Sequence, residues 1–117
     1  MAVFSKEILS GSTNGRGIPV AAVATPGTLL HTAVAGATSI DEVWLFAVNN
    51  GAATRTLTIE FGGVADPGDH IEIQIPAQAG PYTVAPGLPL QNSLVARAFA
   101  DVANEVTILG YVNRIVP

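Results

Sequence analysis

Short runs rich in Val, Ile, Leu, Thr and Phe, cut at close intervals by Gly, Pro, Asn and Asp, constrain the fold of this chain most strongly. Residues 55–61 show the pattern clearly, because Leu57, Ile59 and Phe61 alternate with two threonines and a glutamate. That period is typical of a β-strand with one buried face. Residues 70–75 alternate in the same way after a turn-forming Asp-Pro-Gly-Asp segment. The two runs predict a pair of consecutive strands.

About eight such runs follow one another, and helical spacing is hard to find. Residues 18–24 and 28–34 are expected to be strands separated by a Thr-Pro-Gly turn, and neighbouring prolines restrict residues 82–84 to a short edge strand. This count predicts an all-β fold, a single-domain antiparallel β-sandwich that is jelly-roll-like. An immunoglobulin-like strand order remains open.

The balance of apolar and charged residues indicates that the chain is part of an assembly. Of its 117 residues, 49% are apolar and only 12% are charged. A folded chain of 12.0 kDa exposes on the order of 6,000 Å², which five Lys/Arg and nine Asp/Glu cover thinly. No apolar run is long enough to cross a membrane. We therefore expect other protein to cover part of the surface.

Charge and cysteine content exclude several classes of partner and site. The chain has no cysteine, which rules out disulfides and thiolate metal sites. Its net charge of −4 argues against nucleic acid as a partner, because phosphate binding requires clustered Lys and Arg. The first ten residues lack the apolar stretch of a secretory signal, so synthesis in the cytoplasm is expected.

Three segments carry apolar residues on both strand faces: residues 42–48, 93–100 and 106–112. In a two-sheet sandwich one face of such a strand meets the opposite sheet, and the other needs a second cover. The candidates for that second, subunit-contacting face are Leu45, Val95, Phe99, Leu109 and Tyr111. The alternative is that these positions lie near an end of the sandwich, where both faces are often apolar.

The N-terminal 17 residues are predicted to be a separate arm and hinge, followed by a sandwich domain over residues 18–117. A glycine-rich polar stretch over residues 10–17 predicts the flexible hinge. Ahead of it lie four apolar residues that an arm would use to dock on a neighbour, together with the later Arg16: Val3, Phe4, Ile8 and Leu9. The equal alternative is a first strand that folds onto the chain's own sheet.

Candidate catalytic and metal-binding residues are few. His31 and His70 are the only histidines, and neither lies in a recognisable nucleophile or zinc-ligand pattern. Asp66 and Asp69 lack the spacing of an EF-hand loop and are interpreted as turn residues. We expect no enzymatic activity, no metal and no cofactor.

A carbohydrate-binding role is the main alternative to assembly. Glu60 and Glu72 would face outward from adjacent strands, where carboxylates usually solvate a sheet. Stacking on sugar rings needs exposed aromatic side chains. Trp44 lies among apolar neighbours, so we expect it to pack in the core, which leaves few aromatic residues for this purpose.

Four segments of the sequence resemble small accessory virion proteins of tailed bacteriophages: residues 57–63, 86–90, 95–100 and 110–115. The resemblance spans about residues 42–115 and consists of turn-and-strand patterns. It is closest in character to capsid decoration, or cement, proteins, which bind the outside of an icosahedral head and clamp neighbouring capsomers. A tail or connector component is a further possibility.

The resemblance implies a structural protein of the virion, located on the capsid surface after synthesis in the host cytoplasm. Its implied partners are the major capsid protein and sister copies in a dimer or trimer, without nucleic acid or membrane. Guanidinium groups grip carboxylates and carbonyls at interface rims, so Arg16 is expected at the capsid contact, and Arg97 and Arg114 at the subunit contact. A virion-surface module that binds a glycan or receptor is the alternative.

Overall fold

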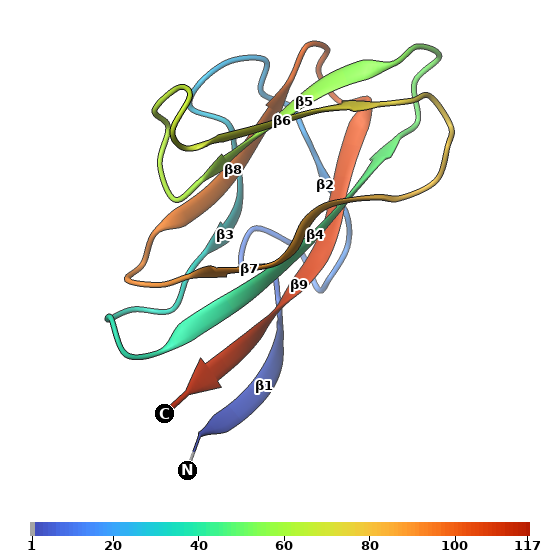
Figure 1. Ribbon diagram of the computed structural model, residues 1–117. Helices are drawn as coiled ribbons and strands as arrows, with labels where there is room; N and C mark the ends of the chain where they lie inside the picture. Colours follow the sequence, from blue (N-terminus) through green and yellow to red (C-terminus); the bar gives the residue numbers. More distant parts are fainter. Residues whose placement is uncertain (1) are drawn as a thin grey trace.

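The computed structural model describes residues 2–117 and folds them into two antiparallel β-sheets that pack together as a sandwich (Figure 1). Within this range no residue is helical. The predicted all-β sandwich is confirmed, with nine strands in place of about eight. The strands are β1 (Val3–Ile8), β2 (Ile18–Pro19), β3 (Thr28–Thr32), β4 (Ile40–Asn49), β5 (Arg55–Phe61), β6 (His70–Ile75), β7 (Tyr82–Leu90), β8 (Val95–Ala100) and β9 (Val106–Val116).

The strand order is that of a jelly roll. Strand β5 pairs with β6, β4 with β7, β3 with β8 and β1 with β9, so the chain forms one long nested hairpin. Successive pairs alternate between the sheets. The larger sheet has the order β1-β9-β4-β7, with the two-residue β2 beside β9, and the smaller has the order β3-β8-β5-β6. This order confirms the jelly-roll prediction, and the immunoglobulin-like alternative does not apply.

Alternating side chains from both sheets build the core. In β4 every second residue is buried, and Val43, Leu45 and Ala47 point at the opposite sheet. Strand β8 meets them with three fully buried alanines, Ala96, Ala98 and Ala100. The accessible surface of the chain is 5951 Å², in agreement with the value expected for its mass.

The alternation of β5 is confirmed, but its outward residues are covered. Leu57 and Ile59 point into the core as predicted. Thr58 and Glu60 face the other way and are nevertheless buried. Glu60 is closed off by the turn before β3, where the backbone N–H of Gly27 donates a hydrogen bond of 2.6 Å to its carboxylate. The expectation that Glu60 only solvates the sheet is therefore wrong.

The N-terminal residues belong to the sandwich. Strand β1 pairs with β9 without a break, from Val3 opposite Val116 to Ile8 opposite Tyr111. Leu9, which follows, is 1% exposed and lies in the core. Of the two alternatives for this segment, the structure has the strand that folds onto the chain's own sheet.

Two other strand boundaries differ from the expectation. Only Ile18 and Pro19 of residues 18–24 form a strand, because the chain then leaves β9 after Val20 donates its N–H to the carbonyl of Val106. The predicted short strand at residues 82–84 continues to Leu90 as β7. Its register against β4 is irregular at two places, where Gly87 and Val84 have no direct partner, and it lies at a sheet edge as predicted.

Candidate assembly surface

The outward side of the larger sheet, here called the outer face, carries most of the partly exposed apolar side chains of β4 and β9. Alternate β4 residues point there, and their direct partners on β9 point the same way. Trp44 opposes Tyr111 and Phe46 opposes Leu109 in this register. No third layer covers these side chains within residues 2–117. The prediction of a second apolar face is confirmed for β4 and β9.

Trp44 lies on the outer face, so its predicted place in the core is wrong. Its ring is nearly parallel to that of Tyr111, with an interplanar angle of 14° and 6.3 Å between the ring centroids. The ammonium nitrogen of Lys6 lies 4.5 Å from the centroid of the Tyr111 ring, within the range of a cation–π contact. These contacts order a row of side chains across three adjacent strands.

Glu42 is the acidic residue of this surface. The indole N–H of Trp44 donates to its carboxylate at 3.0 Å, and the side-chain amide of Asn113 donates at 3.2 Å. The hydrogen bond from Trp44, followed by that from Asn113, lowers the pKa of Glu42 below its usual range. Glu42 therefore presents a fixed carboxylate at neutral pH.

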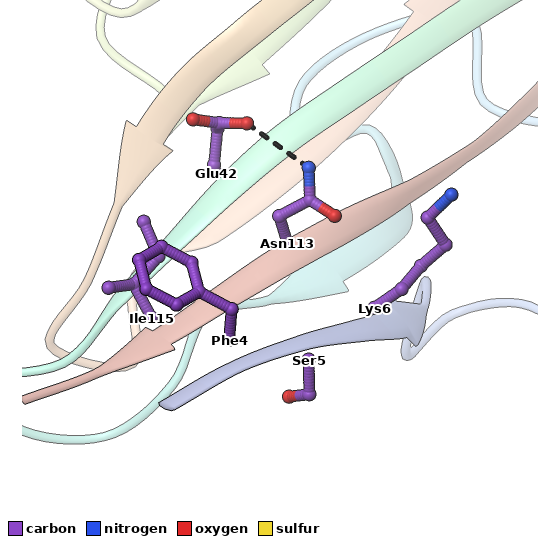
Figure 2. A pocket seen from close by; sticks show the side chains of 6 residues that line it. All are labelled: Phe4, Ser5, Lys6, Glu42, Asn113 and Ile115. Atoms are coloured by element: carbon purple, nitrogen blue, oxygen red, sulfur yellow. Dashed lines mark hydrogen bonds between the residues drawn. The ribbon is translucent and has the colours of Figure 1, made fainter. Parts of the chain in front are cut away.

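A pocket of about 310 Å³ opens where the outer face meets strand β1 (Figure 2). Phe4 and Ile115 lie close together at the lower left of the view, the Glu42–Asn113 pair lies above them, and Lys6 lies at the right. Ser5 points away from the rest, beneath β1. The pocket has apolar and charged walls and sits directly beside the sheet edge.

The residues predicted to contact a capsid divide into two groups. Val3, Phe4 and Ile8 are 62%, 70% and 55% exposed on β1, and Arg16 is exposed in the loop that follows. Leu9 is buried in the chain's own core, so its prediction as a contact residue is wrong. The exposed members lie along one sheet edge and the adjoining loop.

The residues predicted to contact sister copies lie in four places. Leu109 and Tyr111 lie on the outer face. Val95, Arg97 and Phe99 point outward from the smaller sheet, on the opposite side of the molecule. The prediction is wrong for Leu45, which is fully buried between the sheets. Arg114 is bound within the chain to Asp41 with 29% of its side chain exposed, and its contact with a sister copy stays a prediction.

A buried polar cluster joins the two sheets near the end of β9. Asp41 is fully buried and receives two hydrogen bonds from the Arg114 guanidinium, at 2.8 and 3.0 Å. His31 of the smaller sheet donates its Nε2 hydrogen to Asp41 at 2.7 Å, and its Nδ1 accepts the backbone N–H of Ser10 at 3.0 Å. The backbone N–H of Val34 donates to the same carboxylate at 3.0 Å.

The electrostatics of Asp41 follow from these contacts. Burial raises the pKa of this carboxyl, but the hydrogen bonds and charge of Arg114 and the hydrogen bond from His31 outweigh burial and hold the pKa below 3.8, its ordinary value. The cluster therefore holds an ionised carboxylate between the sheets. Its members are 10 and 73 residues from Asp41 in the sequence, and no short motif connects them.

A second polar cluster covers the outward side of β5. Glu60 accepts hydrogen bonds from the hydroxyl of Thr25 and the N–H of Gly27. Nε2 of His70 lies 3.4 Å from a Glu60 carboxylate oxygen, and its Nδ1 lies 3.5 Å from Asp66. Among residues 2–117, no group of three His, Cys, Asp or Glu side chains is placed to hold a metal ion.

Residues 2–117 include no helix that is long and apolar enough to span a membrane. Comparison of the chain with protein-family models, with curated proteins and with solved structures finds no match.

Proposed function

We propose that this chain is a non-enzymatic structural protein of a tailed bacteriophage, a capsid decoration protein that binds the outer surface of the head. The observation that carries the proposal is the uncovered apolar outer face, continuous with the exposed apolar strand β1. Large uncovered apolar patches on a soluble domain mark contact sites for other proteins. The resemblance of residues 42–115 to accessory virion proteins supplies the class of partner.

The two parts of this surface suit two different contacts. The outer face around Phe46, Leu109 and Tyr111 is broad and mostly apolar, as in the contact of an obligate oligomer, and we assign it to sister copies. The β1 edge with Phe4 and Ile8 projects beside it, and we assign it to the capsid shell. A shell with many identical sites needs only a moderate contact at each, because an oligomer binds several of them at once.

Replacement of Leu109 with glutamate is expected to abolish self-association. Leu109 is 39% exposed at the centre of the assigned sister contact, and burial of an unpaired carboxylate there is strongly unfavourable. Sedimentation velocity of the variant should give the 12.0 kDa monomer, whereas the parent chain should sediment as a dimer or trimer.

Leu94→Glu is the matched control. Leu94 is 46% exposed, receives the same substitution and precedes β8 in the smaller sheet. This variant should associate as the parent does. An oligomer in Leu109→Glu equal to that of the parent would refute the assignment of the outer face to sister copies.

One observation favours the second candidate, a glycan-binding module. Trp44 and Tyr111 lie together on the outer face, beside the carboxylate of Glu42 and the amide of Asn113. Aromatic rings flanked by such polar groups can hold a sugar. A ligand that binds only the folded chain raises its melting temperature, so a thermal-shift screen against host polysaccharides tests this role. A rise for one polysaccharide that Trp44→Ala removes would support it.

A further inference from the structure

Strand β1 presents an open edge of the larger sheet. It is the last strand in the order β1-β9-β4-β7, and in the described part of the chain no strand lies on its far side. Its six residues pair with β9 in an unbroken register and include no proline. The outer main-chain N–H and C=O groups of such a strand are free to pair with another strand.

The three other edge strands are protected. Strand β7 contains Pro86 and Pro89, which cannot donate to a ladder. Strand β3 is covered by the N-terminal segment, where Gly11 donates its N–H to the carbonyl of Leu30 and the hydroxyl of Ser10 accepts the N–H of Thr32. Strand β6 exposes polar Glu72 and Gln74. Strand β1 instead exposes three large apolar side chains, Val3, Phe4 and Ile8, together with Ser5 and Lys6.

The outward side chains of β1 form a pattern of three. Phe4, Lys6 and Ile8 oppose the outward β9 residues, so all three point to the outer face. Phe4 and Ile8 are 70% and 55% exposed. Lys6 lies between them, and among residues 2–117 no carboxylate lies within the 4.0 Å of an ion pair with its ammonium group. The pocket beside Phe4 and Lys6 opens at the same edge.

We propose that β1 accepts an added strand from another protein. In this strand, one apolar residue lies two positions before an acidic residue and another lies two positions after it. In the register of an added strand, the acidic residue lies opposite Lys6 and the apolar residues lie opposite Phe4 and Ile8. The inference rests on the proposed function and deepens it, because it names the kind of segment that the shell would supply.

A second copy of β1 fits this edge poorly. Antiparallel pairing that sets Phe4 opposite Ile8 also sets Lys6 opposite the partner's Lys6, and like charges that are directly opposed destabilise a sheet. Shifts by two residues, which keep the outer faces of both copies on the same side, oppose Glu7 with Glu7 in one direction and Phe4 with Lys6 in the other. Charge complementarity therefore favours a foreign acidic strand.

The test is a titration of the ¹⁵N-labelled full chain with the peptide Thr-Val-Thr-Glu-Thr-Val-Thr. Binding is monitored through the amide chemical shifts of the chain. We expect saturable shifts at residues 3–8 and at their partners on β9. The same peptide with lysine in place of glutamate should bind about five- to tenfold more weakly, since an opposite-charge pair becomes a like-charge pair. In the Lys6→Glu variant this preference should be reversed.

The double variant Gln74→Glu/Ser93→Glu is the matched control, because it changes the net charge equally at two exposed residues, one in β6 and one just before β8 of the smaller sheet. It should keep the preference of the parent chain for the acidic peptide. The proposal is overturned if the peptide changes no amide chemical shifts in β1, or if the preference is not reversed in Lys6→Glu. It is also overturned if the amide chemical shifts of β1 change with protein concentration alone, which would indicate that a second copy binds there.

The same peptides separate this inference from the proposed function. If phage shells bind the chain and an excess of the acidic peptide does not compete, the strand-addition proposal fails and the capsid role stands. If the peptide binds with the expected preference and shells do not bind, the capsid role fails and the β1 edge remains a strand-binding site.

Discussion

Replacement of Asp41 with alanine is expected to lower the free energy of unfolding by about 3–5 kcal/mol, the range found when one partner of a buried ion pair is removed. The substitution leaves the Arg114 guanidinium, the Nε2 hydrogen of His31 and the N–H of Val34 without their acceptor. Because these groups come from both sheets, the loss weakens the contact between the sheets. Urea denaturation followed by tryptophan fluorescence of Trp44 measures it.

Asp41→Asn is the matched variant, and it also separates charge from shape. The folded-state pKa of Asp41 lies below its ordinary value of 3.8. The charge of Asp41 therefore stabilises the fold fully at pH values above 3.8, and this contribution is lost as the pH falls through the folded-state pKa. The amide does not ionise, so the difference in stability between the parent and Asp41→Asn should shrink as the pH is lowered through this range. A difference that stays constant from pH 7 to about pH 2 would contradict the ion-pair account.

Replacement of Leu9 with alanine is expected to lower the free energy of unfolding by about 2–5 kcal/mol, the range for a fully buried leucine. Leu9 is 1% exposed and packs in the core directly after β1. It therefore anchors the N-terminal segment in the core, in addition to the pairing of β1 with β9. Chemical denaturation of the purified variant gives the change.

Phe4→Ala is the contrasting variant, because Phe4 is 70% exposed on the same segment. Its free energy of unfolding should differ from that of the parent by no more than about 0.5 kcal/mol. Equal, small effects of both substitutions would indicate that the first 17 residues form a separate arm. For the same reason, deletion of residues 1–17 removes a core residue and an edge strand, so shell-binding tests need point variants at the exposed positions.

The sequence was sufficient to predict the class of fold, because the alternation in β5 and β6 and the turn residues between them are local signals. It was insufficient for the faces of β4. Both sets of alternate residues in this strand are apolar, with Val43, Leu45 and Ala47 on one side and Trp44 and Phe46 on the other. The inward side also carries Asp41, a charge that normally marks the solvent face. Only the distant Arg114 and His31 explain its burial.

The N-terminal segment shows a second limit of local reasoning. The exposed pattern of β1 and the glycine-rich stretch after it are compatible with a docking arm and with an edge strand. The distinction depends on long-range contacts, in which Gly11 donates its N–H to the carbonyl of Leu30 and His31 accepts the N–H of Ser10. Any side chain at Gly11 would overlap the carbonyl oxygens of Leu29 and Leu30, at 2.5 and 2.8 Å from its Cβ position. A single sequence contains no such distances.

The central claim, a decoration protein of a phage head, is tested most directly by binding to shells. Purified chain is mixed with heads that lack it, the heads are sedimented, and the copies per head are counted by electron cryomicroscopy. The account predicts saturable, symmetric density at the junctions between capsomers, with β1 toward the shell and the outer faces of sister copies in contact. Absence of the chain from sedimented heads, or density on the tail alone, would contradict it.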